Sequence, residues 1–170
     1  LVVKSDCCFS QPVTFKLTLS PEQSQLSISD VKMNLPLTLL EGLGAPFNTL
    51  KPNGDLRVET KKLKLTLANR MMKVSGEMEA EIGSLSSVLS QVKPIGTYTV
   101  IAKGYGDRIR FNLSTRSGAL QLVGSGELTQ KKFRFNAEAS SSLGYELAMS
   151  NLLNVIGRRS GSRSIISMER

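Results

Sequence analysis

Residues 13–19, Val-Thr-Phe-Lys-Leu-Thr-Leu, alternate strictly between apolar and polar side chains, and this stretch decides the fold class. Successive side chains of a β-strand point to opposite faces, so this alternation predicts a strand with one buried and one solvated face. The same pattern recurs at residues 26–28, 56–58, 63–67, 72–82, 98–102, 109–113, 120–122 and 133–139. The sequence therefore predicts a mainly β domain of about nine or more strands that share one apolar face.

Residues typical of tight turns lie between these strands. They are Asn53-Gly54-Asp55, Tyr105-Gly106-Asp107, Ser117-Gly118 and Gln130-Lys131-Lys132. Because tight turns join antiparallel neighbours, we predict a sheet that is mostly an antiparallel meander. The apolar positions change parity between Ile28 and Val31 and between Val58 and Leu63. A one-residue slip sends every later side chain to the opposite face, so each change predicts a turn or a β-bulge.

Three segments show apolar residues at helical spacing instead. The first begins after an Asn34 cap and ends at Gly44. The second runs from a Ser84 cap to the residue before Pro94, and the third covers residues 149–156. We therefore expect two or three short helices that cover an edge or an open end of the sheet.

The order of these elements suggests an internal repeat. Residues 34–82 and 84–139 each fit a helix followed by a hairpin, and residues 146–168 fit a helix and a strand. Two fused helix-plus-hairpin repeats would give this pattern. A β-meander with helical interruptions would look equally self-similar, and the sequence leaves both interpretations open. In either case we expect residues 1–170 to form a single domain.

The composition limits the core and the partners. Hydrophobic residues make up 40% of the 170 residues, but aromatic residues make up 5% and tryptophan is absent, so the core is aliphatic. Lys and Arg number 22 against 14 acidic residues, and the net charge of +8 favours anionic partners such as nucleic acid, acidic proteins or phospholipid headgroups. Nucleic-acid binding usually needs aromatic side chains among the basic ones, and the phenylalanines have mostly inward parity. We therefore expect no nucleic-acid partner.

The beginning of the chain carries two further signals. It starts at Leu1 without an initiator methionine, and it has no apolar run of the roughly 18 residues that a membrane span needs. We therefore expect a soluble piece of a longer protein. Cys7 and Cys8 are adjacent and could bond to each other only through a strained ring, so they form no long-range disulfide. We expect one of them to point into the core and the other outward.

The residue types needed for catalysis are scarce. The chain has no histidine, which removes the commonest general base and the commonest zinc ligand. Glu77, Glu79 and Glu81 recur at period two, so they predict a solvated stripe on one strand rather than an acid–base pair. We predict no enzyme activity, no catalytic residues, no cofactor and no metal site. The alternative, an enzyme, would need a reactive thiol at Cys7 or Cys8.

Basic residues form three groups. The first two groups are Lys61-Lys62 with Lys64 and Lys131-Lys132 with Arg134. In each, the two adjacent lysines lie at an expected hairpin tip, where charges keep strand edges soluble. The third group follows the last helix, where cations suit the helix dipole and where arginine can bind an anionic group through two hydrogen bonds. We therefore take this group as the candidate contact for an anion or lipid headgroup: Arg158, Arg159 and Arg163.

Four segments together resemble one known family. They are residues 94–98 (Pro-Ile-Gly-Thr-Tyr), 113–126 (Leu-Ser-Thr-Arg-Ser-Gly-Ala-Leu-Gln-Leu-Val-Gly-Ser-Gly), 133–139 (Phe-Arg-Phe-Asn-Ala-Glu-Ala) and 152–159 (Leu-Leu-Asn-Val-Ile-Gly-Arg-Arg). Their order and spacing resemble protein N of the bacterial type II secretion system. The resemblance covers residues 94–168, and before them only Asn-Gly-Asp-Leu at residues 53–56 is similar.

This resemblance implies a fold, a compartment and a function. Members of the family typically have an N-terminal inner-membrane anchor and a periplasmic β-rich domain, so the chain would be the periplasmic part, and other secretion subunits its partners. The family is distantly similar to AsmA-type proteins, whose taco-like sheets enclose an apolar trough, and this favours an open, curved antiparallel sheet or half-barrel. We therefore expect a non-enzymatic accessory or assembly component of the secretion apparatus. The alternative is a lipid-binding or lipid-transfer module with an apolar groove. The oligomeric state is left open.

Overall fold

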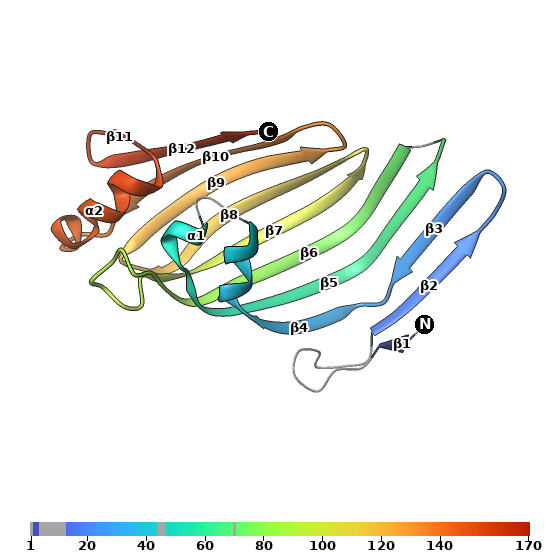
Figure 1. Cartoon of the computed structure of the whole chain (residues 1–170), viewed down its shortest axis with the longest axis horizontal. Coiled ribbons are helices and arrows are strands. Elements are labelled where there is room, and N and C mark those ends of the chain that lie inside the picture. The colour runs from blue at the N-terminus through green and yellow to red at the C-terminus, as the bar shows by residue number, and fades with distance from the viewer. Residues whose placement is uncertain (1, 4–12, 44–46, 70) are drawn as a thin grey trace.

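The computed structural model describes residues 2–3, 13–43, 47–69 and 71–170. Within these ranges the chain forms one open, curved sheet with three short helices (Figure 1). This confirms the predicted fold class, a curved antiparallel sheet with two or three short helices. Cys7 and Cys8 lie outside the described residues, so their orientation stays a prediction.

The sheet is an antiparallel meander of twelve strands in the described ranges. Their order is β1-β2-β3-β5-β6-β7-β8-β9-β10-β12-β11, with β4 paired to β5 beside β3. The bounds are β1 (Val2–Val3), β2 (Val13–Leu19), β3 (Gln23–Ile28), β4 (Val31–Pro36), β5 (Asn53–Ala68), β6 (Met71–Ser86), β7 (Gly96–Gly106), β8 (Arg108–Gly118), β9 (Leu120–Thr129), β10 (Phe133–Ser141), β11 (Arg158–Ser160) and β12 (Arg163–Glu169). The chain reverses at Asp107 between β7 and β8, at Ala119 between β8 and β9 and at residues 130–132 between β9 and β10, at or directly beside the predicted turns.

The strand register gathers the apolar residues on one side of the sheet. Paired residues in an antiparallel sheet point to the same side. One row of paired residues crosses six strands from β5 to β10 and runs Val58, Ala80, Val100, Leu113, Gly124, Ala137. We call this side the apolar face. The other side, the polar face, carries Glu77, Glu79 and Glu81 on β6.

A bulge in β5 sits where the parity change predicted one. The register of β5 against β6 shifts between Lys61 and Lys64, and Lys62 adopts a positive φ of 52°. The backbone N–H of Lys62 donates to Asp30 Oδ1 at 2.9 Å, in the break between β3 and β4. Opposite the bulge, Gly76 has a φ of 111°, and a Cβ there would lie 2.6 Å from the carbonyl oxygen of Lys62. Only glycine fits this position, which lets β5 and β6 stay paired through the bulge.

The helices cover one end of the apolar face. The 3-10 helix η1 (Leu37–Leu43) and α1 (Phe47–Leu50) lie in front of the sheet, and α2 (Glu146–Ile156) lies at its end (Figure 1). Met149, Leu152 and Leu153 of α2 are at most 2% exposed and pack against Leu120 and other buried residues at this end. We call this end the capped end. It holds the tightest core, and the third predicted helix, over residues 149–156, is confirmed.

The second predicted helix is wrong. Ser84 and Ser86 belong to β6, and residues 84–93 form no helix. The side-chain oxygens of Ser87 and Ser90 accept hydrogen bonds from the backbone N–H groups of Leu89 and Val92, 3.2 and 3.1 Å away. Such local bonds compete with helical ones, and Ser87 and Ser90 supply them here. The division into two repeats stays a prediction, although its second unit lacks the expected helix.

Two other boundaries differ from prediction. Asn34 does not cap a helix, because it lies in β4 opposite Arg57, and the helix begins at Leu37 as a 3-10 helix. The predicted turn at residues 53–55 is instead an irregularity at the start of β5, where Gly54 has a φ of 143°. The separate strands expected at residues 56–58 and 63–67 form one long strand. In each case pairing with a distant strand overrides the local turn or helix signal.

Candidate functional site

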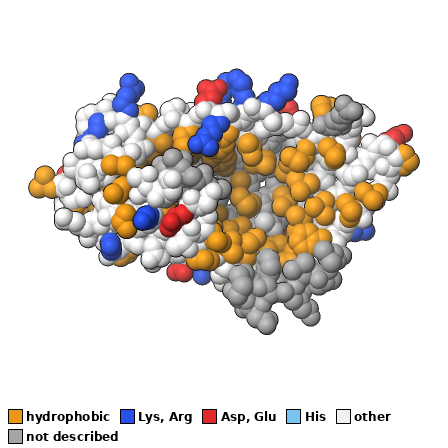
Figure 2. All heavy atoms as spheres, viewed as in Figure 1, with side chains coloured by type: hydrophobic (Ala, Val, Ile, Leu, Met, Phe, Trp, Pro, Cys, Tyr) orange, Lys and Arg blue, Asp and Glu red, His pale blue; other side chains and the backbone are white. Residues whose placement is uncertain are grey.

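The apolar face is covered at the capped end and open at the other. Leu17 and Leu19 of β2 are 61% and 69% exposed, and Leu67 of β5 is 51% exposed. Leu19 and Leu67 both pair with Ser24 of β3, and Leu67 also pairs with Met72 of β6, which is 46% exposed. We call Leu17, Leu19, Leu67 and Met72 the open patch. Figure 2 shows hydrophobic side chains lining a hollow on this face. Contiguous exposed apolar surface of this kind is typical of a binding surface.

An aromatic cluster continues the apolar face toward the other edge of the sheet. The ring of Phe111 stacks between those of Phe133 and Phe135, with centroids 5.8 and 5.7 Å away. Phe111 pairs with Gly126 of β9, and Gly126 pairs with Phe135 of β10. Because Gly126 has no side chain, the Phe111 ring fills the space above it. The three half-buried rings extend the apolar lining across β8, β9 and β10.

The polar face carries paired charges. Glu77 lies 3.5 Å from Lys103 Nζ, and Glu81 lies 3.6 Å from Arg57 and also contacts Arg116. Glu77 and Glu81 therefore point to the solvated side, as the alternation predicted. Most of these side chains are substantially exposed, so the pairs contribute little stability and leave this face hydrophilic.

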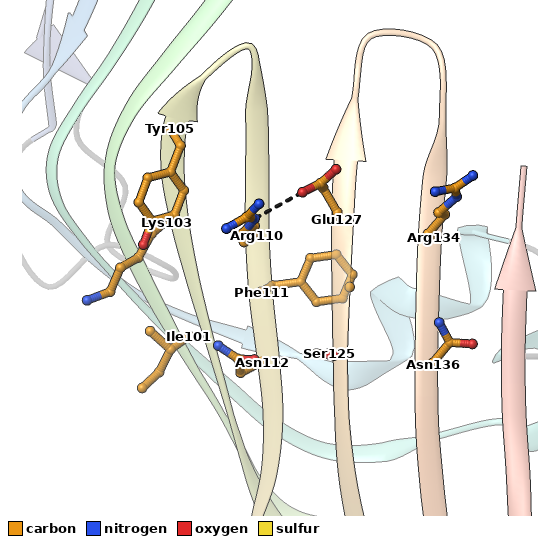
Figure 3. Close-up of a pocket in the computed structure, with 11 residues that line it drawn as sticks. Ile101, Lys103, Tyr105, Arg110, Phe111, Asn112, Ser125, Glu127, Arg134 and Asn136 are labelled. Carbon is orange, nitrogen blue, oxygen red and sulfur yellow. Dashed lines mark hydrogen bonds and ion pairs between the residues drawn. The ribbon is translucent and has the colours of Figure 1, made fainter.

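A shallow pocket of about 370 Å³ lies over β7 to β10 on the polar face (Figure 3). Its rim carries Tyr105, Arg110 and Glu127. Arg110 Nε donates to Glu127 Oε2 at 3.0 Å, and its guanidinium lies 5.8 Å from the centre of the Tyr105 ring. Arg110 is thus already paired with Glu127, and no nucleophile with an adjacent base is among the residues that line the pocket. We assign the pocket no chemistry.

Two carboxylates are held ionised by arginine. Arg108 donates to Asp107 and lowers the pKa of that carboxyl. Arg134 donates to Glu169 Oε1 at 3.1 Å and, with Lys132, lowers the pKa of Glu169. Both carboxylates are solvent-exposed, so these contacts orient surface side chains and do not create an acid or a base poised near neutral pH. Among the described residues, no group of three or more His, Cys, Asp or Glu is placed to hold a metal ion.

The three candidate arginines lie on one hairpin but not on one face. Arg158 and Arg159 form β11 with Ser160, and Arg163 begins β12. Arg158 pairs with Ile165, whereas Arg159 pairs with Ser164, so their side chains point to opposite faces. Arg163 Nη1 lies 3.1 Å from Glu138 Oε1, while Arg159 Nη1 donates to the Ser162 carbonyl oxygen at 3.4 Å. Arg158 and Arg163 therefore share the polar face, and an anion bridged by all three does not fit this arrangement.

A groove that sequence reasoning missed runs beside β12. It has a volume of about 600 Å³ and lies between Ile156 and Gly157, at the end of α2, and Ile166 to Met168 of β12. Arg158 and Arg170 also line it. The alternation at residues 163–168 indicated the strand. Only the short length of β11, which pairs with residues 163–165 alone, leaves this side of the strand open.

The comparisons with known proteins give the family. The family model described as type II secretion system (T2SS), protein N, matches residues 2–166, nearly the whole chain. This chain belongs to the type II secretion system protein N family. No curated protein and no solved structure matches it.

Membership confirms the resemblance and extends it toward the beginning of the chain. The segments that carried it lie within residues 94–168, whereas the family match begins at residue 2. This protein N chain is therefore a component of the type II secretion system, associated with the cell envelope and with other components of that system. None of the helices in the described ranges has the length and hydropathy needed to cross a membrane. The similarity to AsmA-type proteins stays a prediction.

Proposed function

We propose that this protein N chain is a non-enzymatic accessory or assembly component that acts in the periplasm by contact with other secretion subunits. The observation that carries the proposal is the open patch on a sheet whose other face is charged. Burying a leucine side chain contributes about 1.5–3 kcal/mol, so a partner that covers Leu17, Leu19 and Leu67 would gain substantial affinity. The paired charges of the polar face offer no comparable gain.

The apolar face suits a partner surface better than a reaction. Catalysis needs positioned acids, bases or nucleophiles, and the open patch consists of leucines and a methionine. Its aliphatic side chains offer area and shape rather than chemistry. The net charge of +8 adds attraction to acidic partners and would speed association with them.

The test compares two substitutions on β2. Leu17→Glu places a charge in the open patch, whereas Thr18→Glu places the same charge on the opposite face of the same strand. Both would be made in the full-length protein in its native host. We expect Leu17→Glu to reduce co-purification of secretion subunits and export of a secreted substrate, and Thr18→Glu to leave both unchanged. If no subunit of the apparatus co-purifies or crosslinks with the unaltered protein, the proposal is wrong.

The second candidate is a lipid-binding or lipid-transfer module. Two observations favour it: the hollow lined by hydrophobic side chains (Figure 2) and the aromatic cluster on the same face of the sheet. An acyl chain would lie along the apolar face, and Arg159, on the same face of β11, would be the closest of the three predicted arginines to serve a headgroup. Native mass spectrometry of the protein extracted from membranes distinguishes the two candidates. Absence of any co-purifying lipid rejects this one.

The same proposal includes a location. We infer a periplasmic domain attached to the inner membrane by an N-terminal anchor, as the family resemblance implies. Cysteine substitutions at exposed positions such as Thr18 and Asn112, made in a variant with serine at positions 7 and 8 and labelled in intact and permeabilised cells, would test it. Periplasmic residues react with a thiol reagent that crosses the outer membrane but not the inner one. Labelling only after lysis would contradict the location.

A further inference from the structure

We propose that the free edge of β12 binds an extended, acidic segment of a partner protein by adding it to the sheet as one more strand. This inference rests on the proposed function, because it names a contact through which the chain would join the apparatus. It concerns the sheet edge, which is distinct from the open patch. Three observations carry it: unpaired backbone groups, a groove beside them, and two unpaired arginines.

The backbone of β12 is left open on one side. Phe133 and Arg170 exchange two backbone hydrogen bonds of 2.8 and 3.0 Å between β10 and the end of β12. Hydrogen-bonded and non-hydrogen-bonded pairs alternate in an antiparallel ladder, so Met168 and Ile166 also point their N–H and C=O groups toward β10. Ser167 and Glu169 consequently point theirs away from it. In the described part of the chain, no strand pairs with them on that side, because β11 reaches only Ile165.

The groove leaves room for an added strand at this edge. Its volume of about 600 Å³ lies beside Ile166, Ser167 and Met168, and its other wall is Ile156 and Gly157. A Cβ on Gly157 would lie 2.5 Å from the carbonyl oxygen of Ile165, so glycine lets the chain leaving α2 pass close to β12. Exposed edges of this kind are usually blocked by a charge, a proline or a bulge pointing outward. Here the outward backbone groups face an accessible groove.

The positive charges at the two ends of the groove favour an acidic partner strand. Arg158, beside Ile165, points to the polar face, and Arg170, beyond Met168, points to the apolar face. Both are exposed, and neither forms an ion pair among the described residues. The nearest carboxylate, Glu169, is already held by Arg134 and Lys132 at 3.1 and 3.7 Å. An added strand with an acidic residue at each end and apolar side chains facing Ile166 and Met168 would therefore complement the edge.

Proline tests the backbone contact directly. Ser167→Pro removes the outward N–H and adds a ring on the open side, without removing any backbone hydrogen bond to β10. Ser167→Ala is the matched control, because both variants lose the hydrogen bond from Ser167 Oγ to Asn136 Oδ1, while only alanine keeps the backbone donor. A second variant, Arg158→Glu, reverses a charge that has no ion-pair partner in the described ranges, and so provides a readout even if the proline variant is unstable.

The probes are two synthetic peptides of about ten residues, in which valine alternates with glutamate or with lysine. Alternation places every charged side chain on the face of Arg158 and every valine on the face of Ile166 and Met168. We expect the glutamate peptide to bind the full chain and to slow hydrogen exchange of the Ser167 and Glu169 amides. Ser167→Ala should keep this binding and Ser167→Pro should weaken it at least about tenfold, because strand addition depends on main-chain bonds. Arg158→Glu should weaken the glutamate peptide and strengthen the lysine peptide.

Several results would overturn the inference. Equal binding by the proline and alanine variants would exclude strand addition, and equal binding of both peptides would exclude the acidic partner. Protection of the Ser167 and Glu169 amides that grows with protein concentration in the absence of peptide would replace the partner with a second copy of this chain. Co-purification of secretion subunits is measured in parallel with Ser167→Pro. If the subunits are retained while the peptide does not bind, the edge inference fails and the proposed function stands.

Discussion

Ionisation of Tyr98 should destabilise the fold at high pH, because its phenol group is sealed inside the capped end. The side chain is 0% exposed, and its hydroxyl donates to the Leu120 carbonyl oxygen at 3.0 Å. Burial raises the pKa of Tyr98 well above its usual value near 10, since a phenolate there would lose its hydration. The folded chain therefore holds this proton at a pH where the unfolded chain releases it.

The sign and the size of this change in the free energy of unfolding follow from the linkage between proton binding and folding. A pKa that is raised on folding gives stability that is fully present below the unfolded value and is lost as the pH rises above it. From about pH 10 to the folded pKa of Tyr98, this one group should remove about 1.4 kcal/mol of unfolding free energy per pH unit. Tyr98→Phe removes the titration, so its stability should fall less steeply above pH 10. At neutral pH the same variant should lose about 1 kcal/mol with the hydrogen bond to Leu120.

Urea denaturation followed by circular dichroism between pH 8 and about pH 11 would measure this effect as the difference between two slopes. Lysines also titrate in this range, but they are the same in both proteins and cancel in the difference. Tyr105→Phe is the control, because it removes the same hydroxyl group from a ring that is 57% exposed. Parallel stability curves for the unaltered protein and Tyr98→Phe above pH 10 would refute the reasoning.

Two further predictions concern the core and the bulge. Leu152→Ala, on the buried side of α2 at a site 2% exposed, should cost about 2–5 kcal/mol of unfolding free energy. Leu147→Ala, on the same helix but 95% exposed, should cost less than about 1 kcal/mol. Equal losses in thermal or urea unfolding would mean that α2 does not seal the capped end. Gly76→Ala should cost about 1–3 kcal/mol, because its φ of 111° and the nearby Lys62 carbonyl leave no room for a methyl group. Gly42→Ala, where a Cβ would meet nothing within 4 Å, should change the denaturation midpoint little, and a neutral Gly76→Ala would remove the bulge argument.

Most strands could be predicted because their signal is local. Alternation places residues such as Phe133, Phe135 and Ala137 on one side through the pleat of a single strand, whatever the neighbouring strands are. The bulge near Lys62 was equally visible, because a parity change needs no knowledge of the partner strand. The helix over residues 149–156 was predicted for the same reason, since its apolar spacing matches one helix face.

The errors arose where two structures compete for one segment. The apolar residues from Leu85 to Val92 fit a helical face, yet Val88 is 62% exposed and the serines bond locally to the backbone. Asn34 and the residues around Gly54 carried turn and cap signals, but pairing along β5 satisfied their backbone instead. The intrinsic preferences of most residue types for helix or strand differ by about 1 kcal/mol per residue or less, so a ladder of strand hydrogen bonds can outweigh them.

For the candidate site, too, the sequence showed which residues to consider, and the strand register and the helices decided where they lie. The sequence shows a cluster of charge at Arg158, Arg159 and Arg163, but the strand register places the Arg159 side chain on the opposite face from the other two. The open patch was implied only as an apolar face. Its exposure depends on the helices covering one end of that face and not the other.

By itself, the sequence determined the β class, the two unlike faces, the antiparallel order and the secretion family. Alternation, turn residues and family segments are all local patterns, so they can be recognised from residues that are neighbours in the chain. Only the tertiary structure decided which part of the apolar face is covered and that Ser167 and Glu169 lie on a free edge. These features depend on how far β11 and the helices reach across residues distant in the chain. No local pattern encodes that reach, since it is set by packing and by the pairing of whole strands.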